Sequence, residues 1–494
     1  MQRNNVSTCV RISGYLFIGL AIVAICFLYS LGTFEKFAGF FYVTGYGALS
    51  VSYYLATLSF AYMNRRFVEK RSKEYWRSTD EENPPPPVAV HVVGYREDPQ
   101  YFRDCLESVK GLEYPNLRHI TVVVDGNEEG DLYMADIARD VFGLNVTSIN
   151  LEFIPSDRVG DKTIIYPGQF DCPVPVFVVA QPHAGKREAL YTAYLISTES
   201  KNVEFFLSTD SDTILHKHAV DELVAMVVED SVYAVAGRLK IFNKTNWLTY
   251  LTAARYFVAF NVERASQGFN GVVGCISGPL GLYRVSAVSL VVDEWVKQTF
   301  LGKKCTFGDD RHMTNRLLSL GGKIFYSHKS CADTETPSSY SRFVAQQTRW
   351  SKSYWRELLL QSGWATKHWY LMMETVYGIV FPVLVLVTLL MTIFRRSWSS
   401  LLAITVVTFM IPFLRCLVVF LFFESNCIIM LGVVYPILYF TTLIPVKFAA
   451  LLTMGQNNWG TSSRKKIVKN FGPVVPVAMW LGILLFGIIL QAVV

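Results

Sequence analysis

The stretch Phe205-Phe206-Leu207-Ser208-Thr209-Asp210-Ser211-Asp212 joins a short apolar run to two carboxylates. An apolar run of this length is typical of a strand that is buried on both faces of a sheet. Two runs upstream end in a similar way, because Asp125 follows residues 120–124 and Tyr95 lies just past residues 88–93. Ligands bind at the carboxyl ends of the strands in open parallel sheets, so we expect these polar side chains to share one site.

Helical patterns separate the apolar runs. One pattern follows residues 88–93, and another begins near Lys186, after the apolar run 176–180. Apolar strands that alternate with helices predict an α/β domain with an open, mostly parallel sheet and helices on both faces. The consecutive prolines 84–87 favour an extended connection, and they mark the start of this domain.

Charged residues at these strand and helix ends suggest a phosphate-containing ligand. Asp210 and Asp212 flank a serine, a spacing at which two carboxylates can share one divalent ion. Hard oxygen ligands select Mg²⁺ or Mn²⁺, and such ions usually also bind substrate phosphates. Lys186 and Arg187 supply positive charge for the same phosphates. The alternative for this basic pair is an ordinary solvated helix start.

A second pair of carboxylates, Asp309 and Asp310, lies downstream and is followed by residues 346–350, which read Gln-Gln-Thr-Arg-Trp. A carboxylate can take a proton from a sugar hydroxyl, and an aromatic face can hold a sugar ring. We therefore predict that Asp310 is the general base, with Asp309 as the next candidate, and that Trp350 is the platform for the acceptor. The alternatives are a helix start whose acids complement the helix dipole and a tryptophan anchored at a membrane interface.

The composition is that of a membrane protein, because 51% of the 494 residues are hydrophobic and only 17% are charged. Each apolar tract is near the roughly 20 residues needed to cross a bilayer. The first tract is too long for a signal peptide and lacks a small-residue cleavage site, so we expect it to stay in the mature protein. The candidate spans are Gly14 to Leu31, Phe40 to Met63, Tyr370 to Phe394, Leu401 to Phe423, Cys427 to Leu452 and Phe471 to Val493.

Basic residues flank the α/β domain on both sides. Arg65 and Arg66 follow the second candidate span, and Arg342 and Lys352 precede the third. Positive charge next to membrane spans is concentrated on the cytoplasmic side. We therefore predict a multi-pass protein of the plasma membrane whose α/β domain lies in the cytosol.

Other features exclude several classes of protein. The nine cysteines are scattered without a C-x-x-C pair, which argues against a disulfide or zinc framework. The net charge of +6 is modest and no dense basic helix occurs, so we expect no nucleic-acid partner. This charge fits anionic membrane lipid and a nucleotide substrate, and nothing in the sequence indicates an obligate protein partner.

These motifs resemble those of the processive family 2 glycosyltransferases of membranes, the group of cellulose, chitin and hyaluronan synthases. They are most similar to the class I hyaluronan synthases. The separated acids and the Q-x-x-R-W pattern are typical of the whole superfamily, whereas Gly-Asp-Asp-Arg-His at 308–312 and Gln-Gln-Thr-Arg-Trp-Ser-Lys-Ser-Tyr at 346–354 are more specific. The resemblance covers nearly the whole chain and includes residues 124–127, 185–188, 210–213, 260–265, 275–281 and 459–462.

The resemblance implies a GT-A-like glycosyltransferase domain fused to an α-helical transmembrane domain with amphipathic interface helices. It implies that UDP-glucuronic acid and UDP-N-acetylglucosamine are polymerised into hyaluronan with Mg²⁺ or Mn²⁺, and that the nascent polysaccharide crosses the membrane. The implied roles are uracil and ribose binding by Tyr95 and Asp125, diphosphate binding by Lys186, Arg187, Gln346 and Arg349, metal binding by Asp210 and Asp212, proton transfer by Asp310, acceptor binding by Trp350 and Cys275, and closure over the nucleotide by Trp459-Gly460-Thr461.

The implied loop at Trp459 constrains the membrane topology. If it closes over a cytosolic nucleotide, the chain must cross the bilayer an even number of times between Arg356 and Trp459. We expect Cys427 to Leu452 to lie bent at the interface, because Pro436 and Pro445 each remove a backbone donor. The predicted parts are a helix pair (1–64), a basic and Pro-rich linker (65–87), the glycosyltransferase domain (88–340), interface helices (341–369), membrane helices with an interfacial segment (370–458), a gating loop (459–470) and a last membrane helix (471–494).

Three alternatives remain open from the sequence. A chitin synthase that uses one donor would keep nearly all of these motifs, and the sensitivity of the product to hyaluronidase or chitinase separates the two enzymes. A non-processive membrane glycosyltransferase would not need so many spans. A non-enzymatic transporter or scaffold would have no need for the intact set of acids.

Overall fold

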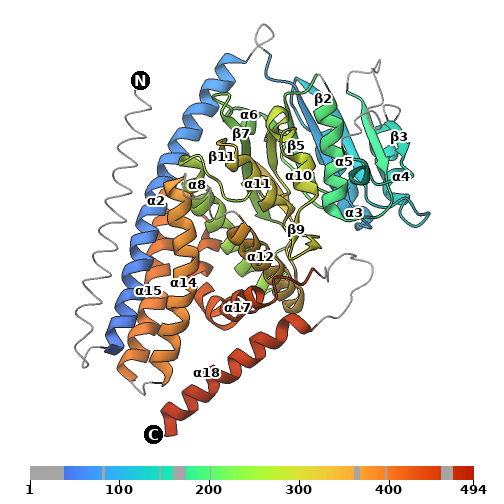
Figure 1. Ribbon diagram of the computed structural model, residues 1–494. Helices are drawn as coiled ribbons and strands as arrows, with labels where there is room; N and C mark the ends of the chain where they lie inside the picture. The colour runs from blue at the N-terminus through green and yellow to red at the C-terminus, as the bar shows by residue number, and fades with distance from the viewer. Residues whose placement is uncertain are drawn as a thin grey trace.

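The computed structural model describes residues 38–79, 84–143, 146–159, 174–200, 202–360, 368–394, 398–457 and 471–493. An α/β domain lies at one end of a group of long helices, and the C-terminus lies at the far end of those helices (Figure 1). The hydrophobic core of the α/β domain is formed by its strands and by the helices that pack on them.

The α/β domain contains a nine-stranded sheet in the order β3-β4-β2-β1-β5-β8-β7-β11-β6. The first five strands in this order run parallel, while β8 is antiparallel to both of its neighbours. The prediction of a mostly parallel sheet is therefore confirmed. The strands are β1 (Val88–Gly94), β2 (Leu117–Val124), β3 (Val146–Asn150), β4 (Val176–Ala180), β5 (Phe205–Asp210), β6 (Ile214–Leu215), β7 (Val232–Ile241), β8 (Gly281–Arg284) and β11 (Lys323–Thr334).

Local sequence explains where the helices of this domain begin. Helix α3 (Pro99–Lys110) starts with proline, and the side chain of Asp98 accepts hydrogen bonds from the backbone N–H groups of Gln100 and Tyr101. Helix α5 (Lys186–Glu199) packs on β1 and β2, and α4 (Tyr133–Phe142) packs on β2 and β4. Both sit on strands that carry the polar ends predicted above.

The register of the parallel strands brings the predicted polar residues to one edge. Gly94 of β1 pairs with Val124 of β2, and Val93 pairs with Asp210 of β5. Tyr95 and Asp125 therefore leave the sheet beside Asp210, at the carboxyl ends of three adjacent strands. This edge faces the long helices of the membrane domain through a shared cavity.

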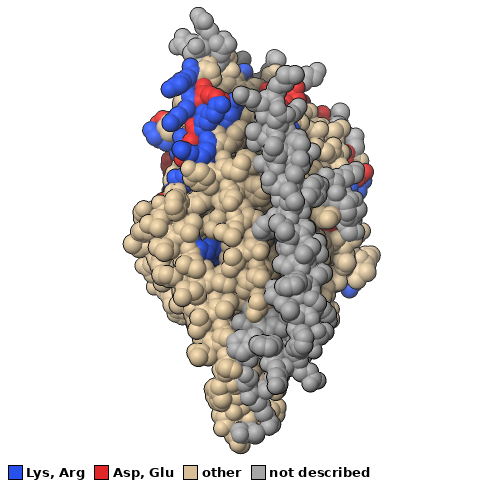
Figure 2. All heavy atoms as spheres, turned by 90° about the vertical axis from the view of Figure 1, so that its left-hand side faces the viewer, with Lys and Arg blue, Asp and Glu red and all other residues tan. Residues whose placement is uncertain are grey.

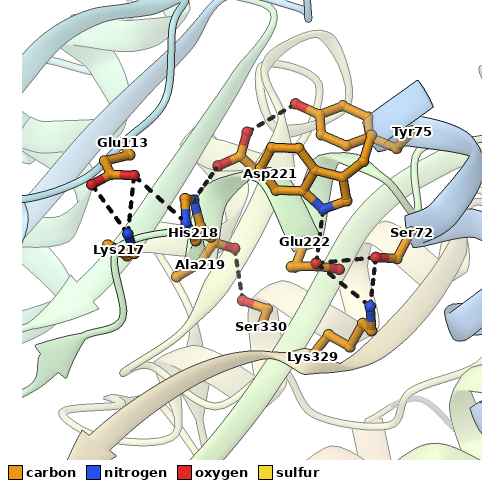
Figure 3. Close-up of polar contacts among 11 residues, drawn as sticks. Ser72, Tyr75, Glu113, Lys217, His218, Ala219, Asp221, Glu222, Lys329 and Ser330 are labelled. Atoms are coloured by element: carbon orange, nitrogen blue, oxygen red, sulfur yellow. Dashed lines mark hydrogen bonds and ion pairs between the residues drawn. The ribbon is translucent and has the colours of Figure 1, made fainter. Parts of the chain in front are cut away.

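Helix α2 (Ala38–Ser78) extends across the predicted boundary at residue 65 and continues without interruption to Ser78. Contacts with α6 (Ala219–Val224) hold this extension on the α/β domain (Figure 3). Ser72 and Trp76 donate to Glu222 at 3.0 and 3.1 Å, and Tyr75 donates to Asp221 at 3.0 Å. These partners are far away in the sequence, so a reading of residues 65–78 alone could not distinguish a helix from a linker.

Four stretches of the described residues are long and apolar enough to cross a membrane. They are Trp369–Phe394, Leu401–Phe422, Tyr435–Leu452 and Gly472–Val493. They include most of α14 (Trp369–Phe394), α15 (Trp398–Phe422) and α18 (Val475–Val493), and α14 and α15 both pack against α2. The expected span at Gly14 to Leu31 lies outside the described residues, and the one at Phe40 to Met63 lies within α2 and stays a prediction.

The segment after α15 is broken into short pieces. It consists of η6 (Cys427–Val433), α16 (Tyr435–Leu438), η7 (Tyr439–Leu443) and α17 (Ile444–Leu452), and a proline lies in the first turn of both α16 and α17. Arg238 of β7 pairs with Glu424 at 2.8 Å, and the side chain of Asn457 donates to the backbone of Lys304 at 2.6 Å. Both ends of the segment therefore contact the α/β domain.

Candidate active site

One cavity of about 1110 Å³ extends from the carboxyl ends of β1, β2 and β5 to the space between the long helices. It gathers most of the predicted site residues from distant parts of the chain. Trp459, Gly460 and Thr461 lie outside the described residues. The predicted residues that line the cavity are Tyr95, Asp125, Lys186, Asp210, Asp212, Cys275, Asp309, Asp310, Gln346, Arg349 and Trp350.

Tyr95 and Asp125 lie in the part of the cavity nearest β1 and β2. The ring of His183 stacks on Tyr95, with ring centroids 3.9 Å apart. Asp125 is buried, and its carboxylate accepts hydrogen bonds from the backbone N–H groups of Ala184 and Gly185 at 3.0 and 2.8 Å. Asp125 thus orders the loop that leads into α5 and holds His183, whose ring stacks on Tyr95.

His183 was not predicted from the sequence. Its Nδ1 lies 2.8 Å from the Asp125 carboxylate, and this hydrogen bond raises the pKa of His183 above its usual value, against the effect of burial. The sequence feature that could have identified His183 is its place just after β4. This strand is also parallel, and it ends at the same edge of the sheet. An aromatic pair at this position offers a stacking surface for a nucleobase.

Lys186 lies among the carboxylates at the centre of the cavity. Its Nζ is 2.7 Å from Asp210 Oδ1, and it also interacts electrostatically with Asp309 and Asp310. Gly278 makes this close packing possible, because a Cβ there would lie 3.0 Å from Asp210 Oδ1, 3.1 Å from Asp310 Oδ1 and 3.1 Å from Lys186 Nζ. A larger residue at position 278 would displace all three side chains.

The adjacent carboxylates at the start of α11 (Asp309–Ser319) have different environments. Burial and the charge of Asp309 raise the pKa of Asp310 to about 7. Burial would also raise the pKa of Asp309, but Lys186 and Arg187 outweigh it and hold that pKa below its usual value. Asp309 therefore stays ionised, while Asp310 can exchange a proton near neutral pH. A general base needs a carboxyl group that can lose and accept a proton near the working pH, and Asp310 meets this requirement.

Arg187 does not lie where the sequence suggested. It is buried, its guanidinium donates to the backbone oxygen of Trp295 at 3.3 Å and lies over the ring of Trp295, and it does not line the cavity. Successive residues of a helix point roughly 100° apart, so Lys186 and Arg187 leave α5 in different directions. The positive charge of Arg187 acts on Asp309 from outside the cavity lining, and its role toward a diphosphate stays a prediction.

Helix α12 (Tyr340–Leu360) supplies the far wall of the cavity. Gln346, Arg349 and Trp350 are spaced three and four residues apart, so they share one face of the helix. Burial lowers the pKa of Arg349, whose charge is offset by Asp309, Asp310 and Asp210. Trp350 is 41% exposed, which leaves much of its ring open to a ligand.

A buried carboxylate fixes α12 against α11. Glu357 accepts hydrogen bonds from His312 at 2.9 Å, from Asn315 at 2.9 Å and from Gln298 at 2.5 Å. Because His312 and Asn315 belong to the helix that begins with Asp309 and Asp310, this network sets the position of the base relative to Trp350. Sequence reasoning did not assign this role to Glu357.

Asp210 and Asp212 fit a divalent cation only if the substrate contributes ligands. Both carboxylates line the cavity at the end of β5, but no group of three or more His, Cys, Asp or Glu in the described part of the chain could hold a metal. Mg²⁺ typically binds one or two carboxylates together with phosphate oxygens and water. The residues present are therefore compatible with an ion that arrives with a nucleotide diphosphate.

An α/β domain with acids at the carboxyl ends of its strands, joined to membrane-capable helices, fits a membrane-associated glycosyltransferase. The family model described as Glycosyl transferase family group 2 matches residues 205–455. Hyaluronan synthase 3 of Xenopus laevis is 38% identical over 418 residues, which cover 82% of this chain and 73% of the relative. Hyaluronan synthase 2 of Homo sapiens is 36% identical over 460 residues, which cover 90% of this chain and 81% of the relative.

The chain belongs to the hyaluronan synthase family, and it is a hyaluronan-polymerising glycosyltransferase of the hexosyltransferase class. Among solved structures, a mannosyltransferase from Pyrobaculum calidifontis in complex with GDP-Man and Mn²⁺ is similar, with a TM-score of 0.45 and 14% identity. That similarity covers 83% of this chain and 98% of the mannosyltransferase.

Proposed function

We propose that this chain transfers glucuronic acid and N-acetylglucosamine alternately from their UDP donors to one growing polymer, and that the polymer leaves through the space between the membrane helices. The observation that carries this proposal is the continuity of the cavity. Its lining runs from Tyr95 and Asp210 in the α/β domain to Tyr46 of α2 and Phe381 of α14. Synthesis and export would therefore share one continuous path.

On the donor side, the Tyr95 ring would stack on uracil, and Lys186 and Arg349 would offset the charge of the diphosphate. Mg²⁺ or Mn²⁺ held by Asp210 and Asp212 would stabilise the negative charge that develops on the UDP leaving group. Lys186 lies 2.7 Å from Asp210. This part of the cavity therefore offers a carboxylate to a divalent cation and an ammonium group to the diphosphate.

On the acceptor side, Trp350 would hold the terminal sugar ring and Cys275 would line the same subsite. Asp310 takes the proton from the acceptor hydroxyl as its oxygen attacks the anomeric carbon of the donor sugar. The bond from that carbon to the UDP oxygen breaks, and UDP leaves with the electron pair. The attack occurs opposite the leaving group, so the anomeric configuration is inverted and no covalent enzyme intermediate is required.

The lining of the deeper cavity supports transport of a polar, anionic polymer. It combines aromatic rings, such as Tyr53 and Tyr439, with the basic residues Arg415 and Lys447. A polysaccharide cannot shed its water into hydrocarbon without large cost, so a protein-lined path is needed. Aromatic faces suit sugar rings, and basic groups suit the carboxylates of glucuronic acid.

The test is synthesis by the purified full chain in lipid vesicles with both UDP-sugars and Mg²⁺ or Mn²⁺. We expect UDP release to depend on both donors and on the divalent cation, and we expect a polymer that hyaluronidase digests and chitinase does not. Polymer made from UDP-N-acetylglucosamine alone and digested by chitinase would support the chitin synthase alternative instead.

We further propose that the α/β domain lies in the cytosol and that residues 427–452 do not cross the bilayer. Lys and Arg side chains gather at the end of α2 that passes the α/β domain (Figure 2), and they include Arg65, Arg66, Lys70 and Arg71. Positive charge of this kind favours the cytoplasmic side. The contacts of Glu424 and Asn457 with the α/β domain support a segment that begins and ends on that side.

This topology predicts which positions an external reagent can reach. In a chain otherwise free of cysteine, we expect Ser463→Cys to resist a membrane-impermeant maleimide on intact cells and to react after the membrane is permeabilised. The matched control, Ser397→Cys between α14 and α15, should react on intact cells. Labelling of position 463 in intact cells would mean that residues 427–452 span the membrane.

A further inference from the structure

Two arginines that line the cavity form no close ion pair with a carboxylate in the described part of the chain. Arg264 ends η5 (Ala259–Arg264), and Arg311 follows the proposed base Asp310 in α11. Arg264 donates to the amide oxygen of Gln267 at 2.8 Å, and Arg311 donates to the backbone oxygen of Gly274 at 3.4 Å. Among the described carboxylates, none lies within the 4.0 Å of an ion pair from either guanidinium, whereas nearby Arg255 pairs with Glu263 at 2.9 Å.

The charges of the two guanidinium groups act on each other and on the thiol of Cys275. Burial lowers the pKa of Arg264 and the charge of Arg311 adds to this effect, while Cys275, Glu263 and Glu374 oppose it. Burial raises the pKa of the Cys275 thiol, and both arginines oppose that change. Because neither guanidinium has a described carboxylate within ion-pair distance, an anion that contacts both groups would offset their mutual repulsion at close range. Their arrangement therefore favours an anionic ligand.

This ligand is distinct from the donor diphosphate. Lys186 and Arg349 interact with Asp210, Asp309 and Asp310 at the ends of the strands. Arg311 instead lies over the ring of Tyr354, 5.4 Å from its centroid, and Tyr354 also interacts with Glu374 of α14. The arginine pair thus lies on the side of Asp310 that faces the membrane helices, where the acceptor chain would lie.

We propose that Arg264 and Arg311 form a carboxylate-binding subsite for the glucuronic acid unit of the growing chain. This inference rests on the proposed function, because only an alternating polymer carries a carboxylate on every second sugar. When N-acetylglucosamine is the terminal unit on Trp350, the preceding glucuronic acid presents its carboxylate to the pair. After the next transfer a neutral sugar takes that place. The subsite therefore distinguishes the two states of the acceptor and selects against a neutral chain such as chitin.

The experiment compares acceptor analogues as inhibitors of polymer synthesis by the purified full chain in lipid nanodiscs. The probes are a hyaluronan hexasaccharide, the same hexasaccharide with its carboxylates reduced to alcohols, and a chitin hexasaccharide. We expect the wild-type chain to bind the native hexasaccharide about ten-fold more tightly than the reduced one, because charge-assisted hydrogen bonds to arginine are lost. Equal inhibition by these two probes would overturn the proposal without any variant.

Variants then assign the preference to the two arginines. We expect Arg264→Gln with Arg311→Gln to abolish the ten-fold preference and to shorten the polymer, while the KM values for both donors change less than about two-fold. Arg311→Lys keeps the charge and should retain part of the preference. The matched control is Arg103→Gln on α3, whose guanidinium pairs with Asp140 at 2.8 Å and does not line the cavity, and it should retain the full preference.

Two results would contradict this assignment. A double variant that keeps the preference would place the carboxylate elsewhere, and a large rise in the KM for the donors with unchanged inhibition would assign the pair to the diphosphate. Failure of the proposed function itself looks different, because the wild-type chain would then make no polymer that hyaluronidase digests.

Discussion

We expect Asp310→Asn to lower the rate of polymer synthesis by about a hundred- to ten-thousand-fold, which is the usual loss when a general base is removed. Asparagine has nearly the same volume and can still accept the hydrogen bond from the backbone N–H of Gly278, which lies 3.2 Å from Asp310 Oδ2. What it cannot do is take a proton. UDP binding should therefore survive, and this can be measured by titration with labelled UDP.

The pH dependence gives a second measurement of the same role. Burial and the charge of Asp309 raise the pKa of Asp310 to about 7, and a base is active only when it has lost its proton. The kcat/KM of the wild-type chain should rise as the pH increases through about 7 and level off above it. The residual activity of Asp310→Asn should lack this rise.

The matched control is Asp140→Asn, which makes the same chemical change at a surface ion pair with Arg103. It should retain the wild-type rate and pH profile. If Asp310→Asn polymerised at nearly the wild-type rate, Asp310 would not be the base, and Asp309 would be tested next in the same assay.

The strands and the edge that carries the site could be predicted because the information is local. The run 120–124 is apolar except for Thr121, and every residue of it is buried in β2. A strand buried on both faces needs no distant partner to be recognised in the sequence, and the direction of the chain in parallel strands puts the polar residues that follow at one edge. The convergence of Tyr95, Asp125 and Asp210 follows from these rules alone.

Residues whose role depends on distant contacts could not be assigned in this way. Arg187 follows Lys186 directly, yet the helix turns it toward Trp295, which is more than a hundred residues away. Trp76 falls within the predicted linker 65–87. Its hydrogen-bond partner Glu222 lies in another element, so the local sequence gives no sign of that contact. Likewise, the lack of a close ion pair at Arg264 among the described residues becomes apparent only when the whole cavity is assembled.

The last prediction concerns Lys186, whose charge acts on three carboxylates at once. It pairs with Asp210 at 2.7 Å, and it lowers the pKa of both Asp309 and Asp310. We expect Lys186→Met to lower kcat/KM by about a hundred- to a thousand-fold, because a fixed positive charge near the leaving group is lost. We also expect the rise of activity with pH to move to more alkaline pH, since Asp310 then holds its proton more tightly.

The two effects of Lys186 can be separated by measuring complete pH–rate profiles and UDP affinity for the same variant. Loss of diphosphate binding alone would weaken UDP affinity and leave the midpoint of the profile unchanged, so an unchanged midpoint would contradict the link between Lys186 and Asp310. The control Lys217→Met removes a surface lysine that pairs with Glu113 at 3.3 Å, and it should alter neither quantity. An alkaline midpoint together with a weaker UDP affinity, in Lys186→Met but not in Lys217→Met, would show that one lysine both neutralises the donor and keeps the base ready to accept a proton.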